Sequence, residues 1–312
     1  MLETALQNLI RGKGNELTAY LEEVHFNVPI PNTKAKAHCH FVQLDGNGRP
    51  RVNDFINFIS TKTLEYSIPR SEIDKAKKFH EENNSPSKYS ELELKAKGLF
   101  TNLKKTGEGG EILLYILIQE FLKIPQLFCK MPLKTNPQMH YHGVDGIHAE
   151  YDKTQDMLAL YWGESKIYKN VDQAIASCFK SLKDYMQTAG GATAPQERDL
   201  QLVKDNLDLN DAKLEEAIKK YFDKGDPMFN KMQYRGACLI GFDCDKYPSP
   251  NQINTAQLKV LILKEVDAWH KGLEKEIKKH VHLDTFIIHI FLVPFPSAED
   301  FRKEFLKAIS IK

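Results

Sequence analysis

The stretch GVDGIHAEYDKTQDMLALYWGESKIY, residues 143–168, contains two apolar-rich segments separated by a polar turn. The segments GIHAEYD and MLALYWGESKIY have the composition of β-strands, and KTQD between them is typical of a turn. The second segment nevertheless carries Glu164 and Lys166, although charge in a buried strand ordinarily costs stability. We therefore expect a central hairpin whose charged residues have a role of their own.

Helical and strand patterns alternate on both sides of this hairpin. Before it, GEGGEILLYILIQEFLKIP predicts a buried helix from about residue 110 to residue 123. After it, apolar residues at helical spacing predict a helix over 171–186 that Asn170 caps. Further on we predict a loop at 188–195, two charged helical segments up to Lys224, a strand at 236–243, a helix at 256–279, a strand at 285–295 and a helix at 297–309. This order predicts a mixed α/β core.

The N-terminal part of the chain has a different pattern. Residues 38–60 predict a hairpin, with a strand up to Leu44, the turn DGNG at 45–48, and a second strand through Val52, Phe55 and Phe58. Residues 69–91 are polar and charged, which indicates a linker or surface excursion. We therefore predict an N-terminal region over 1–90, a possible partner contact, and a second domain over 91–312 with a helical insertion at about 188–225.

Composition limits the classes of protein to which the chain could belong. Its 312 residues are 42% hydrophobic and 27% charged, as in ordinary globular proteins. A formal net charge of +1 means that an anionic partner would have to bind a local patch. The first residues lack the features of a signal peptide, and the longest apolar run, 112–118, is too short to cross a membrane. Five cysteines without a CxxC pair indicate free thiols, so we expect a cytoplasmic protein.

The spacing of the hairpin charges predicts where they meet. Glu164 and Lys166 are two residues apart on a strand and share a face, whereas Ser165 points to the other face. Counting inward from the turn brings Asp145 to their level. Two adjacent carboxylates repel each other unless a cation lies between them, and oxygen ligands favour Mg²⁺ or Mn²⁺. Such an ion beside a lysine is suited to phosphodiester hydrolysis.

A plainer interpretation of the same residues is a solvated ion pair. The triplet of an acidic residue, any residue and lysine occurs three more times, at 93–95, 211–213 and 276–278, in charged helical or linker surroundings. Only residues 164–166 end an apolar strand and follow a segment that opens with an aspartate. From the residues alone, a metal site and a structural ion pair both stay open.

The order of helix, Asp-bearing strand, Glu-x-Lys strand and helix resembles the PD-(D/E)xK nuclease superfamily, which has a restriction-endonuclease-like fold. More narrowly, GVDGIH and WGESKIY after GEGGEILLYIL resemble the HamA family, nuclease subunits of the Hachiman anti-phage defence system. The resemblance covers about residues 105–190. It implies that Asp145 and Glu164 bind the metal, that the Ser165 carbonyl completes its coordination, and that Lys166 assists the nucleophilic water. The proline of the superfamily name is absent, because Val144 precedes Asp145.

The resemblance also implies a reaction and a partner. It implies a Mg²⁺-dependent DNA endonuclease, with Mn²⁺ as a substitute, that acts in anti-phage defence in a heterodimer with a HamB-like helicase. The chain itself has no phosphate loop of the form GxxxxGK[ST], so any ATP-driven step must come from that partner. A non-catalytic module of the same fold that binds DNA or a partner, and an RNA nuclease, are the alternatives.

Other charged residues are candidates for the same site. Glu111 begins the predicted buried helix, and in the superfamily that it resembles an acidic residue there often reaches the metal; alternatively, it only complements the helix dipole. Lys169, Lys180 and Lys183 could contact DNA phosphates, or could belong to a solvated helix face. Glu150, near the turn, is expected to face solvent.

Histidines near the motif could suggest zinc. His140, His142 and His148 flank Asp145, but no further histidine or cysteine lies at a familiar ligand spacing, so a structural or DNA-facing role is favoured. The HCH sequence at 38–40 is likewise interpreted as part of a strand rather than as a metal site.

Overall fold

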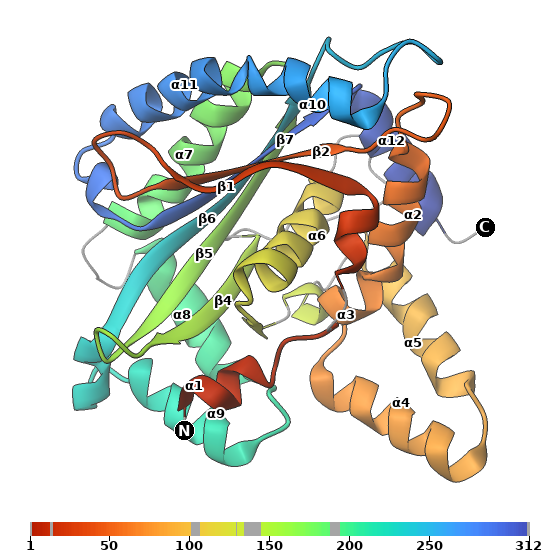
Figure 1. Ribbon diagram of the computed structural model, residues 1–312. Helices are drawn as coiled ribbons and strands as arrows, with labels where there is room; N and C mark the ends of the chain where they lie inside the picture. Colours follow the sequence, from red (N-terminus) through yellow and green to blue (C-terminus); the bar gives the residue numbers. More distant parts are fainter. Residues whose placement is uncertain are drawn as a thin grey trace.

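A seven-stranded mixed sheet forms the centre of the computed structural model, which describes residues 2–12, 15–100, 107–128, 130–133, 145–187 and 194–310. Figure 1 shows the sheet crossing the molecule with helices on both faces. The strand order is β1-β2-β7-β6-β5-β4-β3. The strands are β1 Leu21–Pro29, β2 Lys36–Val42, β3 Gln126–Phe128, β4 Gly146–Asp152, β5 Met157–Tyr168, β6 Met232–Asp243 and β7 Ile288–Phe295. The predicted mixed α/β architecture is confirmed, and it is consistent with a restriction-endonuclease-like core.

The predicted central hairpin is confirmed as β4 and β5. The two strands pair antiparallel, with Asp152 opposite Met157 at the turn and Gly146 opposite Gly163 at the far end. On its other side β5 pairs in parallel with β6, which pairs in parallel with β7. The hairpin therefore lies inside the sheet, and β5 is flanked by strands on both sides.

Helices cover both faces of the sheet. The α-helices are α1 Leu2–Gln7, α2 Val52–Thr61, α3 Thr63–Ser67, α4 Arg70–Asn83, α5 Ser87–Gly98, α6 Glu108–Leu117, α7 Val171–Gln187, α8 Pro195–Asn206, α9 Ala212–Tyr221, α10 Thr255–Leu263, α11 Val266–Lys278 and α12 Ala298–Ile309. A π-helical turn, Ile118–Leu122, continues α6. The single helix predicted at 256–279 is instead the pair α10 and α11. Within the described residues, no helix is both long and apolar enough to cross a membrane.

The side chains of β5 alternate between two apolar cores. Leu158, Leu160 and Trp162 pack into the core that contains residues of α7 and α11. Ala159, Tyr161 and Ile167 pack into the core on the opposite face, with α2, α6 and α12. This alternation is the expected geometry of a strand that is buried on both faces. It places Glu164 and Lys166 on the α7 face and Ser165 on the α6 face.

The prediction of a second strand after the DGNG turn is wrong. Residues 52–61 form helix α2, which buries Phe55, Ile56 and Ile59. These side chains follow a spacing of three and four residues, which places them on one face of a helix. The first predicted strand is correct and is β2, which pairs antiparallel with β1 and in parallel with β7.

The polar segment at 69–91 is not an extended linker. It forms α4 and the first part of α5, two helices that project at the edge of the molecule in Figure 1. Lysine and glutamate favour helix, and pairs such as Lys78 with Glu82 add support along one face. The domain boundary near residue 90 stays a prediction, but β1 and β2 belong to the same sheet as β5.

Candidate active site

The register of the hairpin brings Asp145 and Glu164 to the same level. Gly146 lies opposite Gly163, and the Asp145 amide donates to the Gly163 carbonyl at 2.8 Å. The next residue of each strand is therefore Asp145 on one side and Glu164 on the other. The predicted convergence of these two residues is confirmed.

Ser165 holds the Asp145 carboxylate in place. Its backbone amide and its hydroxyl both donate to Oδ2 of Asp145, each at 2.7 Å. Gly110 of α6 lies directly against Ser165, because a Cβ atom at Gly110 would be only 3.1 Å from the Ser165 hydroxyl. The absence of a side chain at Gly110 thus lets α6 support the serine that orients Asp145.

Glu164 and Lys166 form an ion pair on the α7 face of β5. Glu164 is buried, with 5% of its surface exposed. Burial and the negative charge of Asp145 raise the pKa of the Glu164 carboxyl to about 7, against the opposing effect of Lys166. Burial disfavours the charged form of Lys166, but Glu164 and Asp145 outweigh it and raise the Lys166 pKa above its ordinary value. Lys166 is therefore an ammonium ion at neutral pH.

These residues fit a hard divalent cation. The carboxylates of Asp145 and Glu164 and the carbonyl of Ser165 are oxygen donors, as Mg²⁺ requires. After burial, the negative charge of Asp145 is the next cause of the raised pKa of Glu164, and a cation between the two carboxylates would offset it. Within the described residues there is no cluster of three or more His, Cys, Asp or Glu side chains that could hold a metal. Two carboxylates and a carbonyl would therefore form the protein part of the coordination shell, and water would complete it.

Glu111 is connected to the site through Tyr66. The Tyr66 hydroxyl lies 3.1 Å from Oε2 of Glu111 and 3.2 Å from the carbonyl oxygen of Asp145. Tyr66 is buried on α3, so a residue of the N-terminal region contacts both Glu111 and the Asp145 backbone. Among the described residues, Glu111, Asp145 and Glu164 are not grouped closely enough to form a metal-holding cluster. Its assignment as a metal ligand stays a prediction.

A second buried ion pair lies next to the site. The Lys130 ammonium is 3.0 Å from the Asp199 carboxylate, which is fully buried on α8. Burial lowers the pKa of Lys130, while the charges of Asp199, Asp145 and Glu111 oppose that change. Lys130 is thus close enough for the charges of Asp145 and Glu111 to raise its pKa. Through it, the helical segment that contains α8 is anchored beside Asp145.

Sequence reasoning did not identify Tyr66, Lys130 or Asp199. Tyr66 is 79 residues from Asp145 in the chain, and Lys130 is 69 residues from Asp199. No local spacing connects residues so far apart, so only the tertiary structure reveals these contacts.

The lysines proposed to contact DNA lie in different places. Lys169 is exposed and lines a cleft beside Ser165 and Lys166. On α7, Lys180 is exposed and Lys183 is half-buried, and neither lines that cleft. The structure therefore brings only Lys169 next to the candidate site, and a DNA contact by any of the three stays a prediction.

The described histidines of the predicted candidates lie on strands. His148 is buried on β4, with Nδ1 3.2 Å from the Ile124 carbonyl. His38 and His40 lie on β2, as the strand interpretation predicts. His140 and His142 lie outside the described residues.

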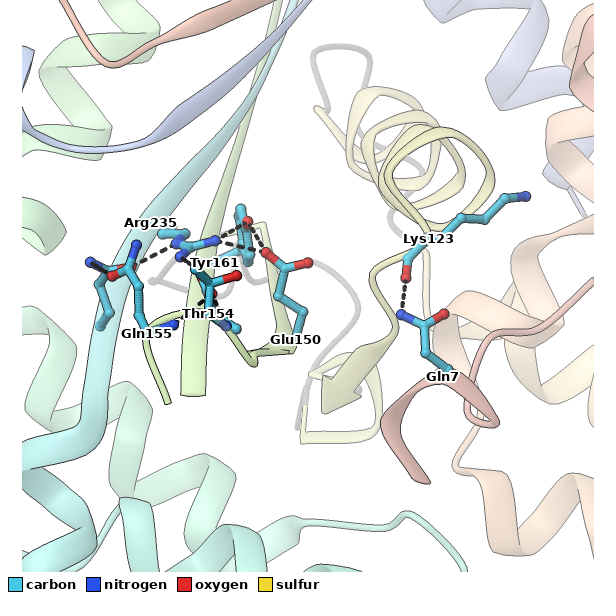
Figure 2. Close-up of polar contacts among 9 residues, drawn as sticks. Gln7, Lys123, Glu150, Thr154, Gln155, Tyr161 and Arg235 are labelled. Atoms are coloured by element: carbon cyan, nitrogen blue, oxygen red, sulfur yellow. Dashed lines mark hydrogen bonds and ion pairs between the residues drawn. The ribbon is translucent and has the colours of Figure 1, made fainter. Parts of the chain in front are cut away.

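The expectation that Glu150 faces solvent is only partly correct, because 30% of its side chain is exposed while its carboxylate binds within the protein. Figure 2 shows Arg235 of β6 directed at Glu150 and Tyr161, with its Nη1 atom 2.8 Å from the Glu150 carboxylate. Arg235 also pairs with Asp152, and only 5% of its surface is exposed. A buried guanidinium needs carboxylate partners, which β4 supplies near the hairpin turn. This network stabilises the end of the hairpin opposite the Asp145 level.

Comparison with known proteins places the chain in a family. A search among curated proteins finds no match. The family model for HamA matches residues 18–309, which is almost the entire sequence and includes every site residue described above. The chain therefore belongs to the HamA family and is a component of a Hachiman anti-phage defence system.

Proposed function

We propose that this protein is a Mg²⁺-dependent DNA endonuclease that acts in Hachiman defence together with a HamB-like helicase subunit. The single observation that supports this most strongly is the placement of Asp145 level with the Glu164–Lys166 pair on adjacent strands. Family membership supplies the defence setting. The DNA substrate, the metal and the heterodimer are parts of the proposal.

The side chains of the chain itself suit particular roles in phosphodiester hydrolysis. Bound Mg²⁺ would polarise a phosphoryl oxygen and lower the pKa of a bound water. Ser165 fixes the Asp145 carboxylate through two hydrogen bonds, so little reorganisation is needed when Asp145 acts as a ligand. Lys166, with its raised pKa, remains an ammonium ion, so it acts by orienting the water and stabilising negative charge rather than as a general base.

The test is cleavage of plasmid DNA by the purified protein with Mg²⁺, with and without the helicase subunit. We expect Glu164→Ala and Lys166→Ala to abolish cleavage. Glu93→Ala and Lys95→Ala are matched controls, because they alter the same Glu-x-Lys triplet on the exposed helix α5. These controls should cleave like the wild type.

Two results would contradict the proposal. Intact cleavage by Glu164→Ala and Lys166→Ala would show that the site is assigned wrongly. DNA binding without metal-stimulated cleavage, by either the protein alone or the protein with helicase, would indicate a binding module instead. Labelled RNA in parallel reactions distinguishes an RNA nuclease from a DNA nuclease.

A further inference from the structure

A cleft of about 600 Å³ adjoins the candidate active site along the C-terminal half of β5. Its walls are the C-terminal half of β5, the start of α6 and the first turns of α12. Ser165, which donates to Asp145, and Lys166, which pairs with Glu164, both line it, so the cleft reaches the contact partners of the two carboxylates. Lys169 and Arg302 are two further cations in its lining.

The cleft lies where β5 extends beyond its pairing with β4. That pairing ends at Gly146 opposite Gly163, five residues before β5 itself ends at Tyr168. Backbone groups of alternate residues point to the same side of a strand. Those of Ser165 and Ile167 therefore point toward the side on which β4 would pair if it continued past Gly146. On that side the Asp145 carboxylate accepts a hydrogen bond from the Ser165 amide, and the Arg302 guanidinium donates one to the Ile167 carbonyl. Arg302 is thus held against β5, at a residue two positions along the strand from Ser165.

The positive charges of Arg302 and Lys169 are not offset by a direct carboxylate partner among the described residues. In the described part of the chain, neither forms an ion pair with Asp or Glu, although Glu299 lies within electrostatic range of both. Glu299 instead pairs with Lys303 at 2.7 Å, and Lys307 of the same helix pairs with Glu304. Three cations line the cleft, Lys166, Lys169 and Arg302, and among the described residues only Lys166 pairs with a carboxylate, that of Glu164.

We infer that this cleft binds the phosphodiester backbone of a nucleic acid strand, with Arg302 and Lys169 contacting phosphates next to the bond at Asp145 and Glu164. The inference rests on the proposed nuclease function and adds the path of the strand. Arginine suits this role because its planar guanidinium can donate to a carbonyl and to a phosphate at once. Phosphate contacts of this kind position the strand without selecting its sequence.

The experiment measures binding of the full chain to fluorescent oligonucleotides by anisotropy, in EDTA, over a range of KCl concentrations. Single-stranded DNA, duplex DNA and RNA are separate arms. Arg302→Gln keeps a donor for the Ile167 carbonyl but removes the charge, and Lys169→Gln is its partner variant. Lys303→Gln is the matched control. It removes one charge from the same helix, but that charge is already paired with Glu299 in the wild type.

We expect Arg302→Gln and Lys169→Gln each to weaken binding roughly three- to tenfold and to reduce the slope of log affinity against log salt by about 0.7–0.9. Lys303→Gln should bind like the wild type. Equal affinity and slope for Arg302→Gln and the wild type would overturn the inference, and so would the absence of binding to all three nucleic acids.

Failure of this inference can be separated from failure of the proposed function. Suppose that metal-dependent cleavage is lost in Glu164→Ala but that binding does not depend on Arg302. The nuclease proposal would then stand, and the cleft would be rejected as the nucleic acid site. Arg302-dependent binding without any cleavage would keep the cleft as a nucleic acid site and contradict the nuclease proposal. Melting curves of each variant confirm that a loss of binding does not reflect unfolding.

Discussion

The Asp145 carboxylate accepts two hydrogen bonds from Ser165, one from its amide and one from its hydroxyl, each 2.7 Å long. Both bonds reach the same oxygen, Oδ2, so Ser165 determines how the carboxylate is rotated. Ser165 in turn packs against Gly110 on the opposite face of the sheet from Glu164. The aspartate and the serine thus form one unit, although only the aspartate was assigned a side-chain role from sequence.

Replacing Ser165 by alanine should impair this unit without unfolding the protein. The amide bond to Asp145 stays, but the hydroxyl bond is lost, so we expect the free energy of unfolding to fall by about 1 kcal/mol. Cleavage should slow on the order of tenfold, because the carboxylate is no longer fixed in one rotation. Ser177→Ala, which removes a hydroxyl contact to Tyr168, is the control. An unchanged single-turnover rate in Ser165→Ala would contradict this role.

Tyr66 should affect metal affinity through its hydroxyl. Tyr66→Phe keeps the ring that packs 5.5 Å from Tyr115 but removes the contacts to Glu111 and the Asp145 carbonyl. Because groups that orient metal ligands alter affinity, we expect the dissociation constant for Mg²⁺ to rise about tenfold, measured by calorimetry. Tyr151→Phe, which removes a hydroxyl bonded to Asp156 at the hairpin turn, should bind Mg²⁺ like the wild type. Equal affinities for all three proteins would exclude this role for Tyr66.

Loss of Asp199 should be strongly destabilising. Asp199→Ala leaves the Lys130 ammonium buried without this carboxylate, which typically costs about 3–5 kcal/mol of the free energy of unfolding. Arg198→Ala is the matched control, because half of the Arg198 side chain is exposed and its contact with Asp199 should contribute less than about 1 kcal/mol. Urea denaturation measures both. A small effect of Asp199→Ala would mean that the pair does not anchor α8.

The buried histidines should make the fold sensitive to acid. The Asn27 amide donates to Nδ1 of His38, and Nε2 of His38 lies 2.9 Å from Nδ1 of His289. Burial, helped by repulsion from His289, His40, His25 and Lys36, lowers the pKa of His38 from 6.5 to about 2. Below pH 6.5 His38 therefore becomes protonated in the unfolded chain but stays neutral in the folded chain. Each such histidine should cost about 1.4 kcal/mol of stability per pH unit as the pH falls toward the folded pKa.

The measurement is the free energy of unfolding at pH 7.5, 6 and 5 for the wild type and for His38→Gln. Glutamine can accept from Asn27 and donate to His289, but it does not titrate. We expect the decline between pH 6.5 and pH 5 to be about 2 kcal/mol smaller in His38→Gln. Parallel curves for the two proteins would show that His38 does not contribute to the acid sensitivity.

Local patterns were sufficient where periodicity and turn chemistry agree. The KTQD turn and the apolar strands beside it predicted β4 and β5, and the same count placed Asp145 level with Glu164. They failed at residues 52–58, where Val52, Phe55 and Phe58 lie three residues apart, a spacing that fits a helix rather than the two-residue repeat of a strand, and where α2 forms. Polar residues at 69–91 carried no apolar signal, although their helix-forming side chains build α4 and α5.

The sequence by itself determined the central hairpin, the mixed α/β class and the meeting of Asp145 with Glu164 and Lys166, because a strand repeats every two residues and a short turn sets the register. Only the tertiary structure decided what surrounds them. Tyr66, Lys130, Asp199 and Arg302 reach the site or its cleft from distant segments, where packing and charge compensation in the folded chain, rather than any spacing along it, bring them together.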